Sequence, residues 1–160
     1  MPPDAIARLR ALAELIPRPG CEWESRPIIA PPAGATVVAE LAVAAGFDLP
    51  ADFLDFLADT AAVIGMSVHN GYHIGDPDVL TATLRAGDLP SNVHGTRSIP
   101  VGFDGGGNAF LITAAGEVWK WDHETGAVSP VASSFGAFLD RVALDWSAYL
   151  ADTPGWRFLV

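Results

Sequence analysis

The chain has 160 residues, 50% of them hydrophobic and 18% charged, which is typical of one globular domain and excludes an intrinsically disordered chain. Its formal net charge is -10, from 19 acidic and 9 basic side chains. This acidity argues against binding to a nucleic-acid backbone, which needs clustered Lys and Arg. It is compatible with a basic protein partner, and the alternative is that it only keeps the protein soluble.

The first 34 residues are predicted to form a helical arm and a proline-rich connector, both part of the same domain as residues 35–160. In Asp4–Ile16 the apolar side chains recur at helical spacing, and Asp4 is suited to cap the helix start. The connector after this helix has room for one short strand at Arg26–Ala30.

Two further helices are predicted in the next part of the chain. Thr36–Ala45 has an apolar face, and Thr36 is a plausible cap. Ala51–Asp59 has a stronger apolar face with two phenylalanines. Pro50 precedes it and is expected at the first helical position, where its missing N–H is not needed.

The segment Ala61–Gly75 admits two interpretations. Apolar residues between Val63 and Val68 predict a strand, with a partner strand at Tyr72–Ile74. Asn70-Gly71 between them favours a hairpin because both residues tolerate positive φ. The alternative is a helix that continues through Ala61–Ile64.

Asp76-Pro77-Asp78 is expected to begin a short helix over Val79–Arg85. Residues Gly87–Gly95 are rich in polar and turn-forming types, so this segment is predicted to be a polar loop without strands.

Residues Ser98–Asp122 predict three antiparallel strands. The apolar runs are Ile99–Phe103, Ala109–Ile112 and Val118–Trp121, separated by turns rich in Gly, Asp and Asn. The connections are too short for a crossover helix, so the strands are expected to form a meander.

Ala127–Ala132 is predicted to add a fourth strand to this meander. Ser133-Ser134 should then cap the last helix, whose apolar residues from Phe135 to Leu150 recur at spacings of three and four. This strongly amphipathic helix is the natural cover for one face of the sheet. The apolar tail Trp156–Val160 is expected to dock on the domain.

Trp119 and Trp121 are two residues apart on one predicted strand, so they project to the same side. Val118 and Lys120 take the other side. We expect the last helix to cover the tryptophan side, which would make both rings part of the core. The alternative is an exposed aromatic pair of the kind that anchors interfaces.

The glycine-rich segment Asp104–Asn108 has the composition of a phosphate-binding loop but the wrong context. A phosphate cradle leads into a helix and usually carries a Lys, whereas Phe110–Ile112 reads as a strand and no Lys follows. We interpret the glycines as a hairpin turn.

Four histidines, His69, His73, His94 and His123, are candidate metal ligands together with Asp76 or Asp122. The sequence contains neither the two-His helix motif nor the paired-Cys motif that frames zinc. We therefore expect partly exposed polar histidines, with no metal, no cofactor and no catalytic residue.

No export or membrane-spanning segment is evident in the sequence. The N-terminus lacks a long apolar stretch, and no window approaches the ~18 apolar residues of a membrane span. Cys21 is the single cysteine, so an internal disulfide is impossible and a reducing compartment fits. We expect a cytoplasmic protein without nucleic-acid or membrane contact, either a monomer or a weak homo-oligomer.

Four segments together are typical of one family. They are the acidic helix with a Leu-Pro corner and an aromatic helix (Ala39–Leu57), Asn70-Gly71, the Ile-Pro strand with its Asp-Gly-Gly-Gly-Asn turn (Ile99–Phe110), and the last strands with the Ser-Phe helix start (Val118–Leu139). In this order they resemble the SUKH superfamily, the Smi/Knr-type domain named after a fungal regulator of cell-wall synthesis. The resemblance covers about Thr36–Leu150. It departs from the family pattern at Ala58–His69, which separates the aromatic helix from Asn-Gly.

The resemblance implies an α+β single domain with a mainly antiparallel sheet of about four to six strands and helices packed against it. It also implies a non-enzymatic immunity protein that binds a cognate toxin, for which a nuclease is one candidate, and blocks its active site. An interaction scaffold or regulator of the Smi/Knr type is the alternative. A metal-dependent hydrolase built on the histidines is the least favoured hypothesis.

Partner-binding residues are expected among polar groups on loops held by a rigid scaffold. The candidates are Asp76, Asp78, Asp104, Asn108, Asp122 and Glu124.

Overall fold

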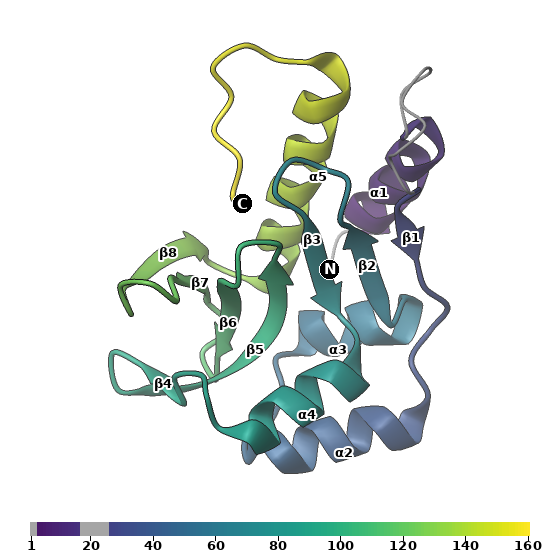
Figure 1. Cartoon of the computed structure of the whole chain (residues 1–160). Helices are drawn as coiled ribbons and strands as arrows, with labels where there is room; N and C mark the ends of the chain where they lie inside the picture. Colours follow the sequence, from purple (N-terminus) through teal and green to yellow (C-terminus); the bar gives the residue numbers. More distant parts are fainter. Residues whose placement is uncertain (1–2, 17–25) are drawn as a thin grey trace.

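An antiparallel sheet lies at the centre of the molecule, and helices pack against it (Figure 1). The computed structural model describes residues 3–16 and 26–160. Cys21 and the first half of the predicted connector, residues 17–25, therefore lie outside the described residues. The α+β class inferred from the sequence is confirmed.

The described helices are α1 (Pro3–Leu15), α2 (Ala35–Ala45), α3 (Ala51–Asp59), α4 (Pro77–Ala86) and α5 (Phe135–Ala151). The strands are β1 (Ile28–Ile29), β2 (Ala62–Gly65), β3 (Tyr72–Gly75), β4 (Asn92–Val93), β5 (Thr96–Asp104), β6 (Ala109–Thr113), β7 (Val118–Trp121) and β8 (Val128–Ala132). The sheet order is β1-β2-β3-β5-β6-β7-β8, and β4 pairs with β5.

The predicted meander and its fourth strand are confirmed, since β5, β6, β7 and β8 pair antiparallel in sequence order. The described part of the sheet has eight strands, however, more than the four to six predicted. Strand β1 lies within Arg26–Ala30, where one short strand was predicted, whereas β4 was not predicted; each has only two residues. A two-residue strand has no alternation to detect, and for this reason the prediction of a strand-free loop at Gly87–Gly95 is wrong.

The ambiguous segment after α3 forms strands, and the alternative helix through Ala61–Ile64 is wrong. The helix ends at Asp59 because Thr60 is extended, with φ -152° and ψ 136°. Strand β2 then pairs with β3 in register Val63 to Ile74. Gly65 lies in β2 directly against α5, where an added Cβ would come within 2.5 Å of Trp146 Cζ2. This close approach excludes any larger residue.

Two of the described helix starts are capped by a side chain, Asp76 at α4 and Ser134 at α5. Ser134 caps α5 as predicted, with its hydroxyl accepting a hydrogen bond from Ala137 N at 3.1 Å. The prediction for Thr36 is wrong, because Gly34 is the N-cap of α2 and Thr36 lies inside the helix. Pro50 takes the N-cap position of α3, one residue before the predicted place.

One core cluster joins the helices to the inner face of the sheet. Phe110, Ile112 and Val118 contribute this face, and α5 covers it with a continuous row of buried residues from Phe135 to Trp146. The apolar face of α1 enters the same cluster: Ala5, Ile6, Leu9, Ala13 and Ile16 are all buried. The N-terminal helix is thus packed on α5.

The tryptophans of β7 face the opposite side of the sheet, so the expectation that the last helix covers them is wrong. Trp119 lies opposite Leu111 on β6 and Pro130 on β8, and directly opposed residues share a face. Both rings remain partly exposed and belong to a smaller outer cluster with Val93 and Leu111. The alternation of side chains along a strand shows that Trp119 and Trp121 lie on the same face of the sheet. It does not show which of the two faces a helix covers.

Candidate functional site

The six residues predicted to contact a partner fall into two separate groups. Asp104, Asn108, Asp122 and Glu124 lie in or beside the turns at one end of the sheet. Asp76 and Asp78 lie at the other end, because Tyr72 pairs with Asp104 and β3 then runs away from it. Asp76 is four residues beyond Tyr72, or roughly 13 Å along the strand direction.

Asp104 forms the β5–β6 turn from within. Its Oδ1 accepts hydrogen bonds from Gly106 N and Asn108 N, both at 2.9 Å, and its Oδ2 accepts one from Asn108 Nδ2 at 2.8 Å. The side chain is only 1% exposed. The expectation that Asp104 is an exposed loop residue is therefore wrong, because both oxygens of its carboxylate accept hydrogen bonds from the turn.

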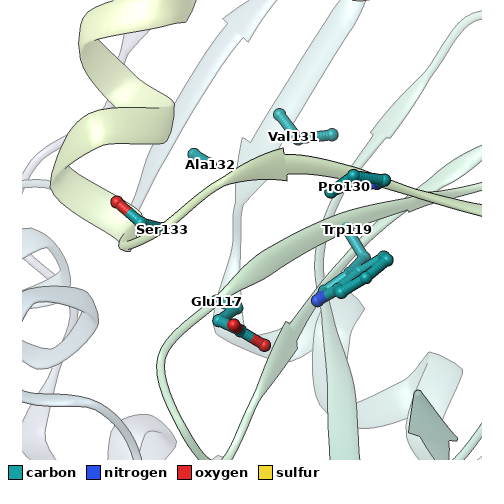
Figure 2. Close-up of a pocket in the computed structure, with 6 residues that line it drawn as sticks. All are labelled: Glu117, Trp119, Pro130, Val131, Ala132 and Ser133. Atoms are coloured by element: carbon teal, nitrogen blue, oxygen red, sulfur yellow. The ribbon is translucent and has the colours of Figure 1, made fainter. Parts of the chain in front are cut away.

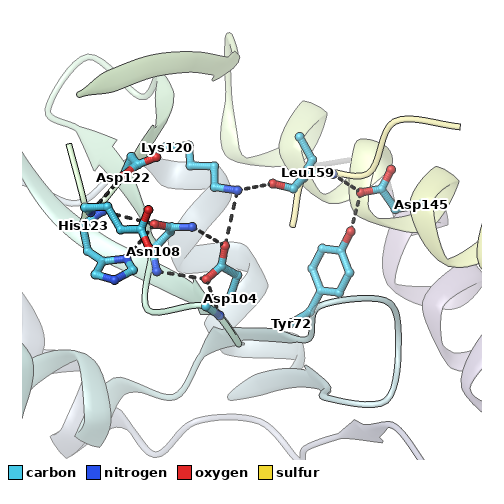
Figure 3. Close-up of polar contacts among 10 residues, drawn as sticks. Tyr72, Asp104, Asn108, Lys120, Asp122, His123, Asp145 and Leu159 are labelled. Atoms are coloured by element: carbon cyan, nitrogen blue, oxygen red, sulfur yellow. Dashed lines mark hydrogen bonds and ion pairs between the residues drawn. The ribbon is translucent and has the colours of Figure 1, made fainter. Parts of the chain in front are cut away.

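Lys120 connects this turn to the C-terminal tail (Figure 3). Its Nζ lies 3.3 Å from Asp104 Oδ2 and donates a hydrogen bond to the Leu159 carbonyl. Burial would raise the pKa of Asp104, but the hydrogen bonds from Asn108 and the charge of Lys120 outweigh it, so that the pKa lies below its usual value.

We expect Asp104→Asn to lower the free energy of unfolding by about 2 kcal/mol at pH 7, because a buried charged acceptor is lost. A lowered folded-state pKa means that the carboxylate stabilises the fold above its unfolded pKa of about 4. This contribution is lost as pH falls through the folded-state pKa. The difference in the free energy of unfolding between wild type and variant should therefore become smaller as the pH falls. Urea unfolding between pH 7 and pH 3 measures this difference.

The control for this substitution is Glu124→Gln, which removes an exposed carboxylate for which no side-chain bond to a described residue is found. Its effect should stay within about 0.5 kcal/mol. If Asp104→Asn lowers the free energy of unfolding as little as the control does, the structural role assigned to Asp104 is contradicted.

Two glycines of the turn, Gly105 and Gly106, lie tightly against Asn70 of the neighbouring β2–β3 loop. Gly105 N donates a hydrogen bond to the Asn70 carbonyl at 2.8 Å, and a Cβ on Gly105 would lie 2.2 Å from the same oxygen. The backbone N–H groups of Gly105, Gly106 and Asn108 are thus all engaged within the protein. This confirms the hairpin-turn interpretation over a phosphate cradle.

The β7–β8 turn is fastened to the same place. Asn108 Oδ1 accepts a hydrogen bond from His123 N at 3.1 Å, and His123 Nδ1 lies 3.1 Å from that oxygen. Asp122 Oδ1 accepts from Glu124 N and Thr125 N, and these backbone bonds lower the pKa of Asp122. We call the Met66–Gly71 loop, the Gly105–Asn108 turn and the Asp122–Ala127 turn together the loop cluster.

Asp76 and Asp78 begin helix α4. Asp76 adopts φ 67° and caps the helix through a 3.5 Å contact from Val79 N to its Oδ1, while its Oδ2 lies 3.2 Å from His73 Nε2. Asp78 is exposed in the first helical turn, where a negative charge favours the helix dipole. Both residues thus have a local structural role.

The four histidines are dispersed and have different neighbours. His69 stacks on Phe158 at 4.2 Å between ring centroids, and His94 packs against Trp119 in a T-shaped arrangement with ring centroids 5.0 Å apart. His73 contacts Asp76, and His123 contacts Asn108, as described above. Within residues 3–16 and 26–160, no three His, Cys, Asp or Glu side chains are arranged to hold a metal ion.

The described cations and a set of exposed carboxylates differ in whether they have partners within the protein. Most of the cations are engaged by the protein's own groups: Arg8, Arg10, Arg26, Arg97, Lys120 and Arg141. By contrast, a set of exposed carboxylates forms no ion pair with a described residue: Glu40, Asp48, Asp78, Asp88, Glu117 and Glu124.

Glu117 was not singled out by the sequence analysis. It lies in the turn between β6 and β7 and lines a surface groove with Trp119, Pro130, Val131, Ala132 and Ser133 (Figure 2). The sequence feature that could have indicated Glu117 is its position two residues before Trp119. If the strand geometry extends into the turn, this spacing places both side chains on the same side of the chain.

Comparison with known proteins identifies one family. A model of the SMI1 / KNR4 family (SUKH-1) matches residues 32–141, which is more than half of the chain. No curated protein shows significant similarity. Among the helices that the structure describes, none is both long and apolar enough to cross a membrane.

Proposed function

The chain belongs to the SMI1 / KNR4 family (SUKH-1), and on this premise we propose that it is a non-enzymatic immunity protein that neutralises a cognate bacterial toxin. The protein would act in the cytoplasm by covering the active site of the toxin. No step of this action requires a catalytic residue, a metal or a cofactor from this chain.

The observation that carries the proposal is the excess of unpaired surface carboxylates. The net charge is -10, and most described cations are held by the protein's own groups, so the negative charge is left for a partner. Complementary charge speeds association and orients the encounter. A basic toxin domain, such as many that act on nucleic acids, would meet this surface favourably.

The loop cluster is suited to contact such a partner without reorganising. Asp104, Gly105 and Asn108 tie its three segments together through hydrogen bonds of 2.8–3.1 Å. A preorganised surface loses less conformational freedom on binding, which favours affinity. Asn108, Asp122 and Glu124 remain our proposed contact residues here, and Asp76 and Asp78 form a second proposed contact region.

The proposal is tested by co-expressing the chain with the toxin domain encoded beside it. We expect restored growth of the host and a complex that co-purifies with an inactive toxin variant. Added salt should weaken the complex because charge drives the encounter. An unrelated toxin domain serves as the control and should gain no protection. If the neighbouring toxin neither binds nor loses toxicity, the proposal fails.

The alternative is an interaction scaffold or regulator of the Smi/Knr type with a partner from the same cell. A detachable N-terminal arm would favour it, because the arm could then carry the partner-binding surface. Ile6, Leu9 and Ile16 of that arm are fully or almost fully buried against the core. Because these side chains are buried, the apolar face of α1 is not accessible to a partner. We therefore prefer the immunity function.

A further inference from the structure

The outer face of β7 and β8 carries a groove with one acidic and one aromatic side. Its lining residues are Glu117, Trp119, Pro130, Val131, Ala132 and Ser133, and we call it the Trp119 groove. Trp119 and Pro130 are directly opposed on neighbouring strands, so they form one continuous wall. In Figure 2 the indole nitrogen of Trp119 is on the edge of the ring that is turned toward Glu117.

The charge of this groove is uncompensated by the described residues. Glu117 is exposed and forms no ion pair with them, and the lining contains no Lys or Arg. The only lysine of the chain, Lys120, follows Trp119 on β7 but points to the opposite face, where it contacts Asp104 and Leu159. A cation bound in the groove would therefore meet no competing internal cation.

A cationic side chain suits both sides of the groove at once. A carboxylate attracts it directly, and the face of a Trp ring is the strongest cation–π acceptor among the aromatic residues. Arg or Lys can in addition lay its apolar stem along Pro130, which shares the face of Trp119. A neutral or acidic side chain would leave the Glu117 charge unpaired or repel it.

Two further features favour a side chain of a larger partner over a free small molecule. The groove has a volume of about 310 Å³, at the lower end of what encloses a small-molecule ligand, and it is open along the strands. The Trp119 indole N–H is buried without an acceptor among the described residues. Buried donors are almost always paired, and because Lys and Arg carry no acceptor, a main-chain carbonyl of the partner's protruding segment would have to accept this hydrogen bond.

We propose that the Trp119 groove is a further docking site of the same partner, in addition to the loop cluster, and that its occupant is a Lys or Arg side chain on a protruding segment of that protein. This inference rests on the proposed function, because it names where the neutralised toxin is held. Trp is among the residues that most often dominate the binding energy of an interface. Glu117 supplies the charge selectivity.

The test measures the affinity of the neighbouring toxin domain by calorimetry for three forms of the chain: wild type, Glu117→Lys and Glu40→Lys. Both substitutions reverse one exposed carboxylate without an ion pair to a described residue, so they change the net charge equally. Glu40 is on α2, which contributes nothing to the groove. We expect Glu117→Lys to raise the Kd at least about 10-fold more than Glu40→Lys does.

A second readout follows the indole N–H signals by nuclear magnetic resonance, with the Trp119 signal assigned from a Trp119→Phe variant. The Trp119 signal should shift when the toxin domain is added. If the toxin binds but the two charge reversals weaken it equally and the Trp119 signal stays in place, the groove is not a docking site, although the proposed function stands. If wild type does not bind at all, the proposed function and this inference both fail.

The remaining outcome concerns a second copy of the chain as the occupant. Sedimentation of the free protein would then show a dimer that Glu117→Lys dissociates and Glu40→Lys does not. That result would overturn the assignment of the groove to a foreign Lys or Arg.

Discussion

Replacing Asp145 with alanine is expected to lower the free energy of unfolding by about 3 to 5 kcal/mol, a large part of the stability of a domain of this size. Asp145 is fully buried in α5. Its removal leaves the buried Tyr72 hydroxyl, the partly buried Trp156 indole N–H and the Arg141 cation without their common acceptor. Urea unfolding at pH 7 measures the loss.

Asp145 joins the C-terminal tail to the core (Figure 3). Its Oδ2 accepts hydrogen bonds from the Tyr72 hydroxyl and from Leu159 N at 2.8 Å. Its Oδ1 accepts from Trp156 Nε1 at 2.8 Å and lies 3.3 Å from Arg141 Nε. This confirms that the apolar tail docks. It also means that the loss of one carboxylate would release helix, strand and tail together.

The titration of Tyr72 reflects the same network. Burial, and then the hydrogen bond and negative charge of Asp145, raise the pKa of the Tyr72 hydroxyl well above its usual value. The hydroxyl therefore stays protonated and donates to Asp145. Hydrogen bonds to a buried carboxylate are stronger than those between neutral groups, which is why we assign Asp145 so large an effect.

Asp140→Ala is the matched control, five residues earlier in the same helix. Its carboxylate is 42% exposed and lies 3.9 Å from Arg8, a pairing expected to contribute less than about 1 kcal/mol. A similar loss for both variants would mean that helix α5, rather than the network around Asp145, is sensitive to substitution. A loss below about 1 kcal/mol for Asp145→Ala would contradict the network outright.

Shortening Leu9 to alanine is expected to cost about 2 to 5 kcal/mol, the range for a fully buried leucine. Leu9 has no exposed surface and belongs to the cluster that contains Phe138 and Trp146 of α5. The cavity left behind cannot collapse easily because α1 is also held by Ile6 and Ile16. Thermal and urea unfolding of the purified variant measure the change.

Leu15→Ala supplies the comparison within the same helix, since Leu15 is 63% exposed. It should change the free energy of unfolding by less than about 0.5 kcal/mol. Equal stabilities of the Leu9 and Leu15 variants would show that α1 is a loosely attached arm. That outcome would revive the scaffold alternative, for which deletion of residues 1–34 should leave a folded domain.

The candidate site could be predicted from the sequence only in part. Asp104 and Asn108 were selected as turn residues, and they do form the turn, but the Asp104 carboxylate points inward and is 1% exposed. The composition of a turn does not show whether its carboxylate points to solvent or accepts hydrogen bonds from the N–H groups of the turn itself. Glu117 escaped selection because its relevance depends on Pro130 across the sheet, a neighbour that only strand pairing brings near.

The sequence by itself determined the local structure of this protein. Ser134 begins α5, the glycine-rich turn reverses β5 into β6, and short apolar runs bounded by turns identify β5, β6 and β7, because caps, turn conformations and strand preferences act over a few residues. Only the tertiary structure decided which face of β7 is covered, that α1 joins the core, and that Asp145 holds the tail. Those outcomes depend on contacts between segments distant in the chain, whose geometry no local pattern encodes.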